Sequence, residues 1–398
     1  MILKVSKKSA QGGLLRTCDS LNYFNYSKRC IGWDLPSRDS PYWWFYYMST
    51  VSVIGMGYIY LPFGLVMTGV KDMHKFSITD LFTYLQAPVN SLSAITKAII
   101  IYFMRKRFFK VHEVMDRMDD LNSGEEDKGA IQKCIKDCRK VTIIYQMIYY
   151  GYLSSAVLGA MANRSTPYHL YNPYINPSES LFEFFVGNVI ESIATNGIIL
   201  TNIVTDVYTI VYVVVLRTHI DLLKRRIENL RSDPDKSEDE NYDELVKCVK
   251  AHRLIIEYAD LIRPVISNTV FVQLVCTGLL LGLSTVSIMF FDIVDRLVTV
   301  YYSMAILSQT FPFCYTCESL LDDCNDLAVI LLHSKWIGAE PRFRKTLVLF
   351  MHQTQAPVSF TACGVVQIGL DTNIKMVKFA FSVFTIVQEM NLMDKFKK

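Results

Sequence analysis

The sequence lacks charged residues over four long stretches. No Asp, Glu, Lys or Arg occurs in residues 41–70, 141–163, 264–291 and 297–317, although the 398-residue chain is 20% charged and 51% hydrophobic. An apolar helix needs roughly 20 residues to cross the ~30 Å hydrocarbon core of a membrane. We therefore interpret the four stretches as membrane spans rather than as buried helices of a large soluble core.

Signatures of catalysis and of metal binding are also missing. The 7 histidines form no HExxH pair or cluster, and no phosphate-binding glycine loop, serine elbow or cofactor fingerprint occurs. Cys314 and Cys317 have the CxxC spacing of zinc ligands, but no second ligand pair follows at metal spacing. We expect no enzyme activity, no cofactor, no metal site and no nucleic-acid partner.

Three further stretches are apolar but carry a few charges. Residues 81–104 contain Lys97, which is close enough to the end of the stretch to extend toward the membrane surface. The charges in residues 181–216 and 357–390 are Glu183, Glu191, Asp206, Asp371, Lys375 and Lys378. Asp371 and Lys375 are spaced i, i+4 and can pair, and charges of this kind rarely face lipid, so the last stretch is expected to border an interior or water-lined surface. The sequence thus predicts an all-α fold with seven transmembrane helices in membrane lipid.

The distribution of basic residues predicts the orientation. With the N-terminus in the cytosol, 31 Lys and Arg residues fall on the cytosolic side, 7 on the outer side and three within spans. Basic residues near span ends favour the cytosolic leaflet. We expect a cytosolic N-terminus and an extracellular C-terminus, opposite to a G-protein-coupled receptor. No cysteine then falls in an outer loop, and no disulfide is expected.

The same topology divides the chain into four parts. They are a cytosolic segment (residues 1–40), six spans with their loops (41–316), cytosolic anchor helices (317–364) and a last span with a short outer tail (365–398). Residues 357–390 would make ~51 Å of helix, too long for one crossing, so we expect residues 342–364 to lie partly in the cytosol. Residues 232–244 are predicted to form a flexible turn, and Pro264 to interrupt the following helix.

The last hundred residues carry a resemblance to a known family. The segments are Phe311-Pro312-Phe313-Cys314-Tyr315, Glu318, Leu321-Asp322-Asp323, Ser334-Lys335-Trp336, Gln355-Ala356-Pro357-Val358, Phe360-Thr361-Ala362-Cys363-Gly364 and Ala380-Phe381-Ser382-Val383-Phe384-Thr385-Ile386. Together they resemble the C-terminal end of insect odorant receptors. Leu230-Arg231-Ser232-Asp233-Pro234 and Arg263-Pro264 further resemble the fruit-fly subgroup that responds to small esters.

The resemblance implies olfaction. It implies a plasma-membrane receptor in sensory neuron dendrites that binds volatile odorants, among them small esters. It also implies a tetrameric, non-selective cation channel assembled with the family's shared co-receptor, whose last helix lines the pore. The family's gate positions correspond to Ile386 and Met390, and Glu389 would attract cations at the mouth. The alternative for Ile386 is packing against a neighbouring helix.

An apolar volatile needs a dehydrated cavity with a few polar groups. In the predicted topology the outer halves of the second, third, fourth and sixth spans enclose one. The candidate ligand-binding residues are Tyr84, Pro88, Ser91, Tyr149, Tyr152, Ser155, Glu191, Thr195, Tyr301 and Met304. Their spacing fits inward-facing positions, but it fits ordinary helix packing equally well.

Two glycosylation sequons test the orientation. Asn163 lies in a predicted outer loop and is expected to be modified, whereas Asn25 lies in the predicted cytosolic segment and is not. Two other functions compete with an odorant receptor. A gustatory receptor would share the architecture, but its closing motif differs from Val387-Gln388-Glu389-Met390. A secondary transporter would show an inverted repeat and broken helices, and we find neither in the sequence.

Overall fold

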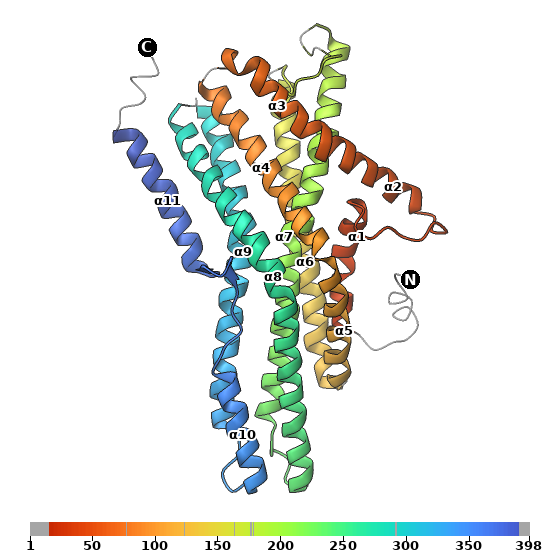
Figure 1. Ribbon diagram of the computed structural model, residues 1–398, viewed down its shortest axis with the longest axis vertical. Coiled ribbons are helices and arrows are strands. Elements are labelled where there is room, and N and C mark those ends of the chain that lie inside the picture. Colours follow the sequence, from red (N-terminus) through yellow and green to blue (C-terminus); the bar gives the residue numbers. More distant parts are fainter. Residues whose placement is uncertain are drawn as a thin grey trace.

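The structure is a computed structural model that describes residues 16–76, 78–122, 124–162, 164–175, 177, 179–290 and 293–389. Long helices run side by side along the longest axis of the molecule, with the end of α11 at one pole and α10 at the other (Figure 1). The only strands within the described ranges are two short ones that pair antiparallel. The predicted all-α class is confirmed.

The chain begins with a short helical region, η1 and α1, and continues with long helices. The elements are η1 (Thr17–Leu21), α1 (Asn22–Cys30), α2 (Trp43–Ser52), the π-helix η2 (Val53–Tyr60), α3 (Leu61–Asp72), η3 (Met73–Lys75), α4 (Ile78–Phe103), α5 (Arg105–Leu121), α6 (Glu125–Ala162), α7 (Leu181–Glu228), α8 (Glu238–Phe290), α9 (Ile293–His333), α10 (Pro341–Thr354), β1 (Thr361–Ala362), β2 (Val366–Gln367) and α11 (Leu370–Glu389).

Four helices of the described chain are long and apolar enough to cross a membrane. They are Trp43–Asp72, Asp127–Ala162, Leu181–Glu228 and Glu238–Met289, and α4 with α5, bent by 62°, gives a fifth if the pair is counted as one span. These five coincide with the first five predicted spans. The sixth and seventh predicted spans correspond to α9 and α11, and α11 carries Asp371, Lys375 and Lys378.

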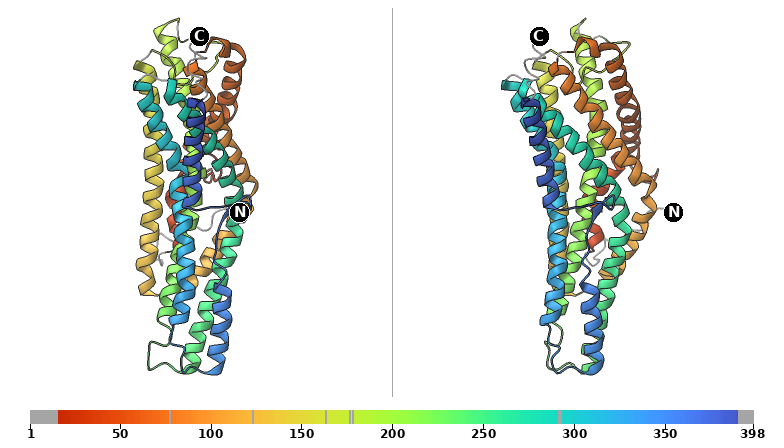
Figure 2. Two further views of the ribbon diagram at one scale, coloured as in Figure 1. Left: turned by 90° about the vertical axis from the view of Figure 1, so that its left-hand side faces the viewer. Right: turned by 60° about the vertical axis from the view of Figure 1, so that its left-hand side comes forward.

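The core of the molecule forms around α7. Its most apolar window is 89% buried, against 17% for that of α6. The helix packs against α6, α8 and α9. The rings of Tyr208 and Tyr212 on α7 and of Tyr258 on α8 are fully buried, and Phe108 on α5 contacts the first two. Helices α7, α8, α9 and α10 extend beyond the ends of α5 and α6, so the lower part of the molecule consists of these four alone (Figure 2).

Two glycines let the first membrane helix cross α7 at close range. A Cβ atom added to Gly197 would lie 3.0 Å from the Cα of Gly57 and 3.3 Å from the Cα of Val53. Such distances leave no room for a side chain. The crossing falls within the π-helix η2, where the wider backbone turn alters the direction of the helix. Tyr58 then reaches the hydroxyl of Thr201 on α7 at 2.7 Å.

The predicted turn at residues 232–244 is confirmed for residues 232–237, which are exposed and lie outside the helices, but it is wrong from Glu238 onward. The predicted break at Pro264 is wrong. Helix α8 begins at Glu238 and continues through Pro264 to Phe290. Its start is a capping box, in which the Glu240 N–H donates to Ser237 Oγ at 3.3 Å and the Ser237 N–H donates to Glu240 Oε2 at 2.8 Å. Proline removes only one backbone hydrogen bond, and packing on both sides of it keeps this long helix continuous.

The region between α10 and the last helix also differs from the prediction. Helix α10 ends at Thr354, and Pro357 follows closely, as is common after a helix C-terminus. The strands β1 and β2 come next, joined by a turn in which Cys363 and Gly364 have φ values of 52° and 72°. Helix α11 therefore begins at Leu370 and not at residue 365, and the predicted boundary at residue 317 lies inside the continuous helix α9.

Candidate functional site

A buried ion pair lies at the centre of the bundle. The ammonium of Lys97 on α4 is 2.5 Å from Asp206 Oδ1 on α7, and the two side chains are 2% and 4% exposed. Lys97 also donates to Gln273 Oε1 on α8 at 2.5 Å, and Tyr149 on α6 donates to Asp206 Oδ2 at 2.5 Å. A buried charge is tolerated only when it is paired and hydrogen-bonded, and both charges meet that condition.

The polar network continues to α9. The Gln273 amide donates to Gln309 Oε1 at 2.6 Å and to Thr277 Oγ1 at 3.1 Å. A cavity of about 20 Å³ lies beside these groups, lined by Lys97, Asp206 and Gln309 among others. It has room for one water molecule. The expectation that Lys97 extends toward the membrane surface is wrong, because its ammonium pairs with Asp206 inside the bundle.

Two further contacts attach α9 to the beginning of α11. The Thr310 hydroxyl donates to Asn373 Oδ1 at 2.8 Å, and Glu318 Oε2 accepts the backbone N–H of Leu370 at 3.3 Å. Glu318 thus caps the first turn of α11 from another helix. Gln309 belongs to the central network and Thr310 to this attachment. The two networks therefore meet at adjacent residues of α9.

A cluster of tyrosines lies between α6, α9 and the loop that follows α6. The rings of Tyr152 on α6 and Tyr302 on α9 lie 5.5 Å apart, and Tyr168 donates to the Tyr152 hydroxyl at 3.5 Å. Glu191 on α7 accepts the backbone N–H groups of Tyr168 and Leu170, both at 2.8 Å. The loop between α6 and α7 is thereby folded back over the helices, and Tyr168 closes the cluster.

The structure separates the predicted ligand-binding residues into groups. Tyr149 belongs to the central network, whereas Tyr152 and Glu191 meet through Tyr168. Tyr84 donates to the Leu65 carbonyl at 2.5 Å and so joins α4 to α3. Of the remaining predicted residues, Ser91 and Thr195 are buried and Pro88 is half-buried. Ser155, Tyr301 and Met304 are exposed.

The predicted gate lies at the end of α11. Ile386 is 55% exposed, and Glu389 is exposed as well. Other apolar side chains of this helix, namely Ile374, Val377, Phe379 and Phe381, are also exposed. Met390 and Asn163, the predicted glycosylation site, lie outside the described residues.

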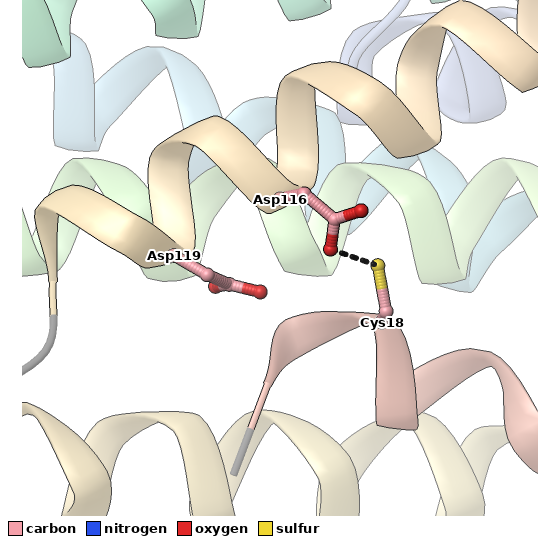
Figure 3. Close-up of side chains that lie close together, drawn as sticks. All are labelled: Cys18, Asp116 and Asp119. Carbon is pink, nitrogen blue, oxygen red and sulfur yellow. Dashed lines mark hydrogen bonds between the residues drawn. The ribbon is translucent and has the colours of Figure 1, made fainter. Parts of the chain in front are cut away.

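A second cluster joins the beginning of the described chain to α5. Cys18 donates to Asp116 Oδ1 at 3.9 Å, and Asp119 lies beside them (Figure 3). Asp116 also accepts from Arg16 at 2.9 Å. Asp119 accepts the backbone N–H and the hydroxyl of Thr17, both at 2.9 Å. Both carboxylates already accept hydrogen bonds from protein donors. These contacts hold η1 on α5, and we call Arg16, Thr17, Cys18, Asp116 and Asp119 the latch.

Burial perturbs the acid–base groups of this latch. It raises the pKa of Asp119 to about 7, while the hydrogen bonds from Thr17 act in the opposite direction. Burial also raises the pKa of the Cys18 thiol well above its usual range, so the sulfur remains protonated and is a poor metal ligand. His219 on α7 joins this latch, because its Nε2 atom lies 3.3 Å from Thr17 Oγ1 and 3.7 Å from Asp119 Oδ1. Burial lowers the pKa of His219 to about 4, and the neutral ring accepts from Asn122 at 3.3 Å.

Sequence reasoning missed Tyr168, Tyr302 and Asn373 as site residues. Tyr168 lies in an irregular loop, and no periodic pattern places a loop over a helix bundle. The other two lie on helices, but only the three-dimensional arrangement shows their partners. Asp206 and Lys97 had a signal, because a charge within an apolar stretch marks a buried polar site.

Long apolar helices around a buried polar core define a helical membrane protein. The chain belongs to the 7tm odorant receptor family, whose family model matches residues 77–381. It is 50% identical over 399 residues to odorant receptor 85a of Drosophila melanogaster, with 100% of both chains covered. Odorant receptor 42b of the same species is 35% identical, with 96% of each chain covered.

Solved structures agree on the fold. The insect olfactory receptor OR5 from Machilis hrabei matches with a TM-score of 0.76 at 16% identity, covering 92% of this chain and 97% of the other. The structure of that receptor in complex with eugenol matches with a TM-score of 0.74, covering 94% and 100%. The odorant-receptor resemblance predicted from the sequence is confirmed, and the relatives are receptors rather than enzymes.

Proposed function

We propose that this chain is the odour-specific subunit of a non-selective cation channel, assembled with the shared odorant co-receptor in the dendrite membrane of sensory neurons. The observation that carries the proposal is the attachment of α11. Thr310 and Glu318 fix its first turn, whereas apolar side chains along the rest of the helix are exposed. An exposed apolar helix fits a surface that neighbouring subunits cover.

The proposed odour site is the tyrosine cluster between α6, α9 and the loop after α6. Tyr152, Tyr168 and Tyr302 offer hydroxyl donors among apolar rings, as a volatile ester with one carbonyl acceptor requires. One hydrogen bond contributes about 1 kcal/mol, and apolar contact supplies ~25 cal/mol per Å². Affinity is therefore expected to be modest. The complex of OR5 from Machilis hrabei with eugenol shows that a receptor of this fold takes a small organic molecule.

Gating in this proposal is a shift between two states. An odorant that binds more tightly when α9 and α11 have moved outward shifts the closed–open balance by that difference in affinity. The central network and the α9–α11 contacts would transmit the movement. Ile386 and Met390 would close the pore by excluding water, and Glu389 would attract cations. The orientation with a cytosolic N-terminus and a glycosylated Asn163 belongs to the same proposal.

The test is electrical. The chain is expressed with and without the co-receptor, and currents are recorded across a panel of volatile esters, alcohols and ketones. We expect cation currents only with the co-receptor, and we expect them to persist when G-protein signalling is blocked. Silence despite delivery to the cell surface, or a requirement for GTP, counts against the channel.

A matched pair of variants tests the odour site. Tyr152→Phe removes one hydroxyl from the cluster, and Tyr150→Phe removes one from a ring on the exposed face of α6. The first change should raise the half-maximal ester concentration about five-fold, the value of one hydrogen bond. The second should leave it unchanged. Equal effects would place the site elsewhere.

A further inference from the structure

A groove runs between α6 and α7 on the outside of the bundle. Its volume is about 290 Å³, and Leu153, Met161, Val189 and Ile193 form its apolar walls. Val189 and Ile193 are 56% and 41% exposed, so the groove opens sideways. Because α6 and α7 are both long and apolar enough to cross a membrane, we infer that this opening faces lipid. Figure 2 shows α6 along one edge of the bundle.

The groove is separate from the tyrosine cluster. Tyr152 faces Tyr302 on α9, whereas the next residue, Leu153, lines the groove. Consecutive residues of an α-helix point about 100° apart, so the two sites lie on different faces of α6. A ligand in the groove would therefore not displace a ligand bound at the cluster.

One wall of the groove carries a buried acceptor without a donor. Asn188 is 1% exposed, and its amide nitrogen donates to the carbonyls of Ser165 at 3.3 Å and Phe184 at 3.0 Å. These two carbonyls fix the orientation of the amide. Asn188 is one of the residues that line the groove, and its Oδ1 atom is buried with no hydrogen-bond partner among the described residues. A buried acceptor without a partner costs stability, and a ligand that donates a hydrogen bond removes this cost.

We propose that the groove is a second small-molecule site, which takes an apolar alcohol from the membrane. The hydroxyl donates to Asn188 Oδ1, and the hydrocarbon part lies against Leu153, Met161 and Ile193. Fatty acyl chains and esters have no donor for this oxygen. The groove, about 290 Å³ in volume, suits a small volatile alcohol.

Photolabelling of the full chain, co-expressed with the co-receptor in cell membranes, tests the site directly. The probe is a medium-chain alcohol that carries a diazirine, and mass spectrometry locates the labelled residues. We expect saturable labelling at the walls of the groove. At equal concentration in the membrane, 1-hexanol should displace the probe about five-fold more effectively than the methyl ether of similar length, because only the alcohol donates a hydrogen bond.

Two variants and one control complete the experiment. Asn188→Leu should abolish the difference between alcohol and ether. Ser192→Phe fills the groove and should remove the saturable labelling, and this variant remains informative where Asn188→Leu does not fold. Leu158→Phe adds the same ring at an exposed position of α6 outside the groove and should change nothing.

Three results would overturn the proposal: labelling spread evenly over the exposed helix faces, equal displacement by alcohol and ether, or equal behaviour of Ser192→Phe and Leu158→Phe. The readout is covalent labelling and not current. The groove and the channel function are therefore judged separately.

Discussion

Lys97 and Asp206 approach to 2.5 Å across the interface of α4 and α7, at a depth where both side chains are almost fully buried. Their pairing draws Tyr149 and Gln273 into one hydrogen-bonded unit. Four helices therefore share a single polar centre. Removing one of its side chains leaves hydrogen-bonding groups of the others buried without a partner. Substitutions in this pair therefore test directly how the polar centre stabilises the bundle.

Asp206→Asn should strongly destabilise the receptor, because it leaves the Lys97 charge buried without a counter-ion. The expected loss is about 3–5 kcal/mol in the free energy of unfolding. Thermal unfolding of the detergent-solubilised complex, followed by size-exclusion fluorescence, measures it. Asp371→Asn is the control, since its ion pair with Lys375 is exposed and should contribute less than about 1 kcal/mol. The double variant Asp206→Asn with Lys97→Met should recover stability, and a failure to do so would contradict this account.

Glu318 should control how readily α11 moves, because its carboxylate caps the first turn of that helix. Glu318→Ala removes the acceptor, and loss of an N-terminal cap costs about 1 kcal/mol. We expect the half-maximal odorant concentration or the basal current to change several-fold, measured by whole-cell recording. Glu318→Gln keeps an acceptor oxygen and should behave nearly as the wild type. Asp322→Ala, an exposed change on the same helix, serves as the control.

The latch at the beginning of the described chain should produce two opposite pH dependences. The pKa of Asp119 is raised from 3.8 to about 7, so its stabilising contribution is present at low pH and is lost as the pH rises through that range. The pKa of His219 is lowered from 6.5 to about 4, so its contribution grows as the pH rises. In the wild type the two effects offset each other between about pH 4 and 7.

Removing either group should expose the effect of the other. The melting temperature of Asp119→Asn should rise more steeply with pH than that of the wild type. That of His219→Gln should fall with pH. Melting curves of the solubilised complex from acid to neutral pH check both slopes. Parallel curves for all three proteins would show that neither group is perturbed by burial.

The crossing of η2 and α7 should tolerate no side chain. Gly197→Ala places a Cβ atom against the backbone of Gly57 and Val53, neither of which is a flexible side-chain end. We expect a loss of about 1–3 kcal/mol and reduced delivery to the cell surface. Gly159→Ala on α6 is the matched control, because nothing lies within 4 Å of its added Cβ atom. Surface biotinylation compares the two, and equal surface levels would mean that the crossing can widen.

Glycosylation should report the orientation. With a cytosolic N-terminus, Asn163 carries a glycan and Asn25 does not. Endoglycosidase treatment should increase the gel mobility of the wild type and leave that of Asn163→Gln unchanged. A glycan that disappears with Asn25→Gln instead would reverse the topology.

The sequence predicted the class of fold and the first five spans, because an apolar stretch of membrane length with few or no charges is a local property of the chain. It failed where a distant contact decides the outcome. Lys97 was expected at the membrane surface, but a carboxylate 109 residues away holds it inside. Pro264 was expected to interrupt a helix that packing keeps continuous. The capping box at Ser237 and Glu240 was a local signal for a helix start. It was missed because the many charged residues around it favoured the interpretation of a flexible turn.

The candidate site was less predictable than the fold. Glu191 was singled out as an odour contact, and in the structure it binds the backbone of a loop. Tyr152 was singled out as well, but its partner Tyr168 lies in that loop, whose path no helical periodicity describes. Periodicity identifies the face of a helix. It does not identify what covers that face.

The continuity of α8 has a mechanical consequence. Its 53 residues make a rod about 80 Å long. One end of the rod meets α10, and farther along it packs against α4, α9 and α11. A tilt imposed at the end that meets α10 must therefore appear beside the last helix as well. In the proposed channel, a protein that binds this end would in this way change odour sensitivity without reaching the ligand.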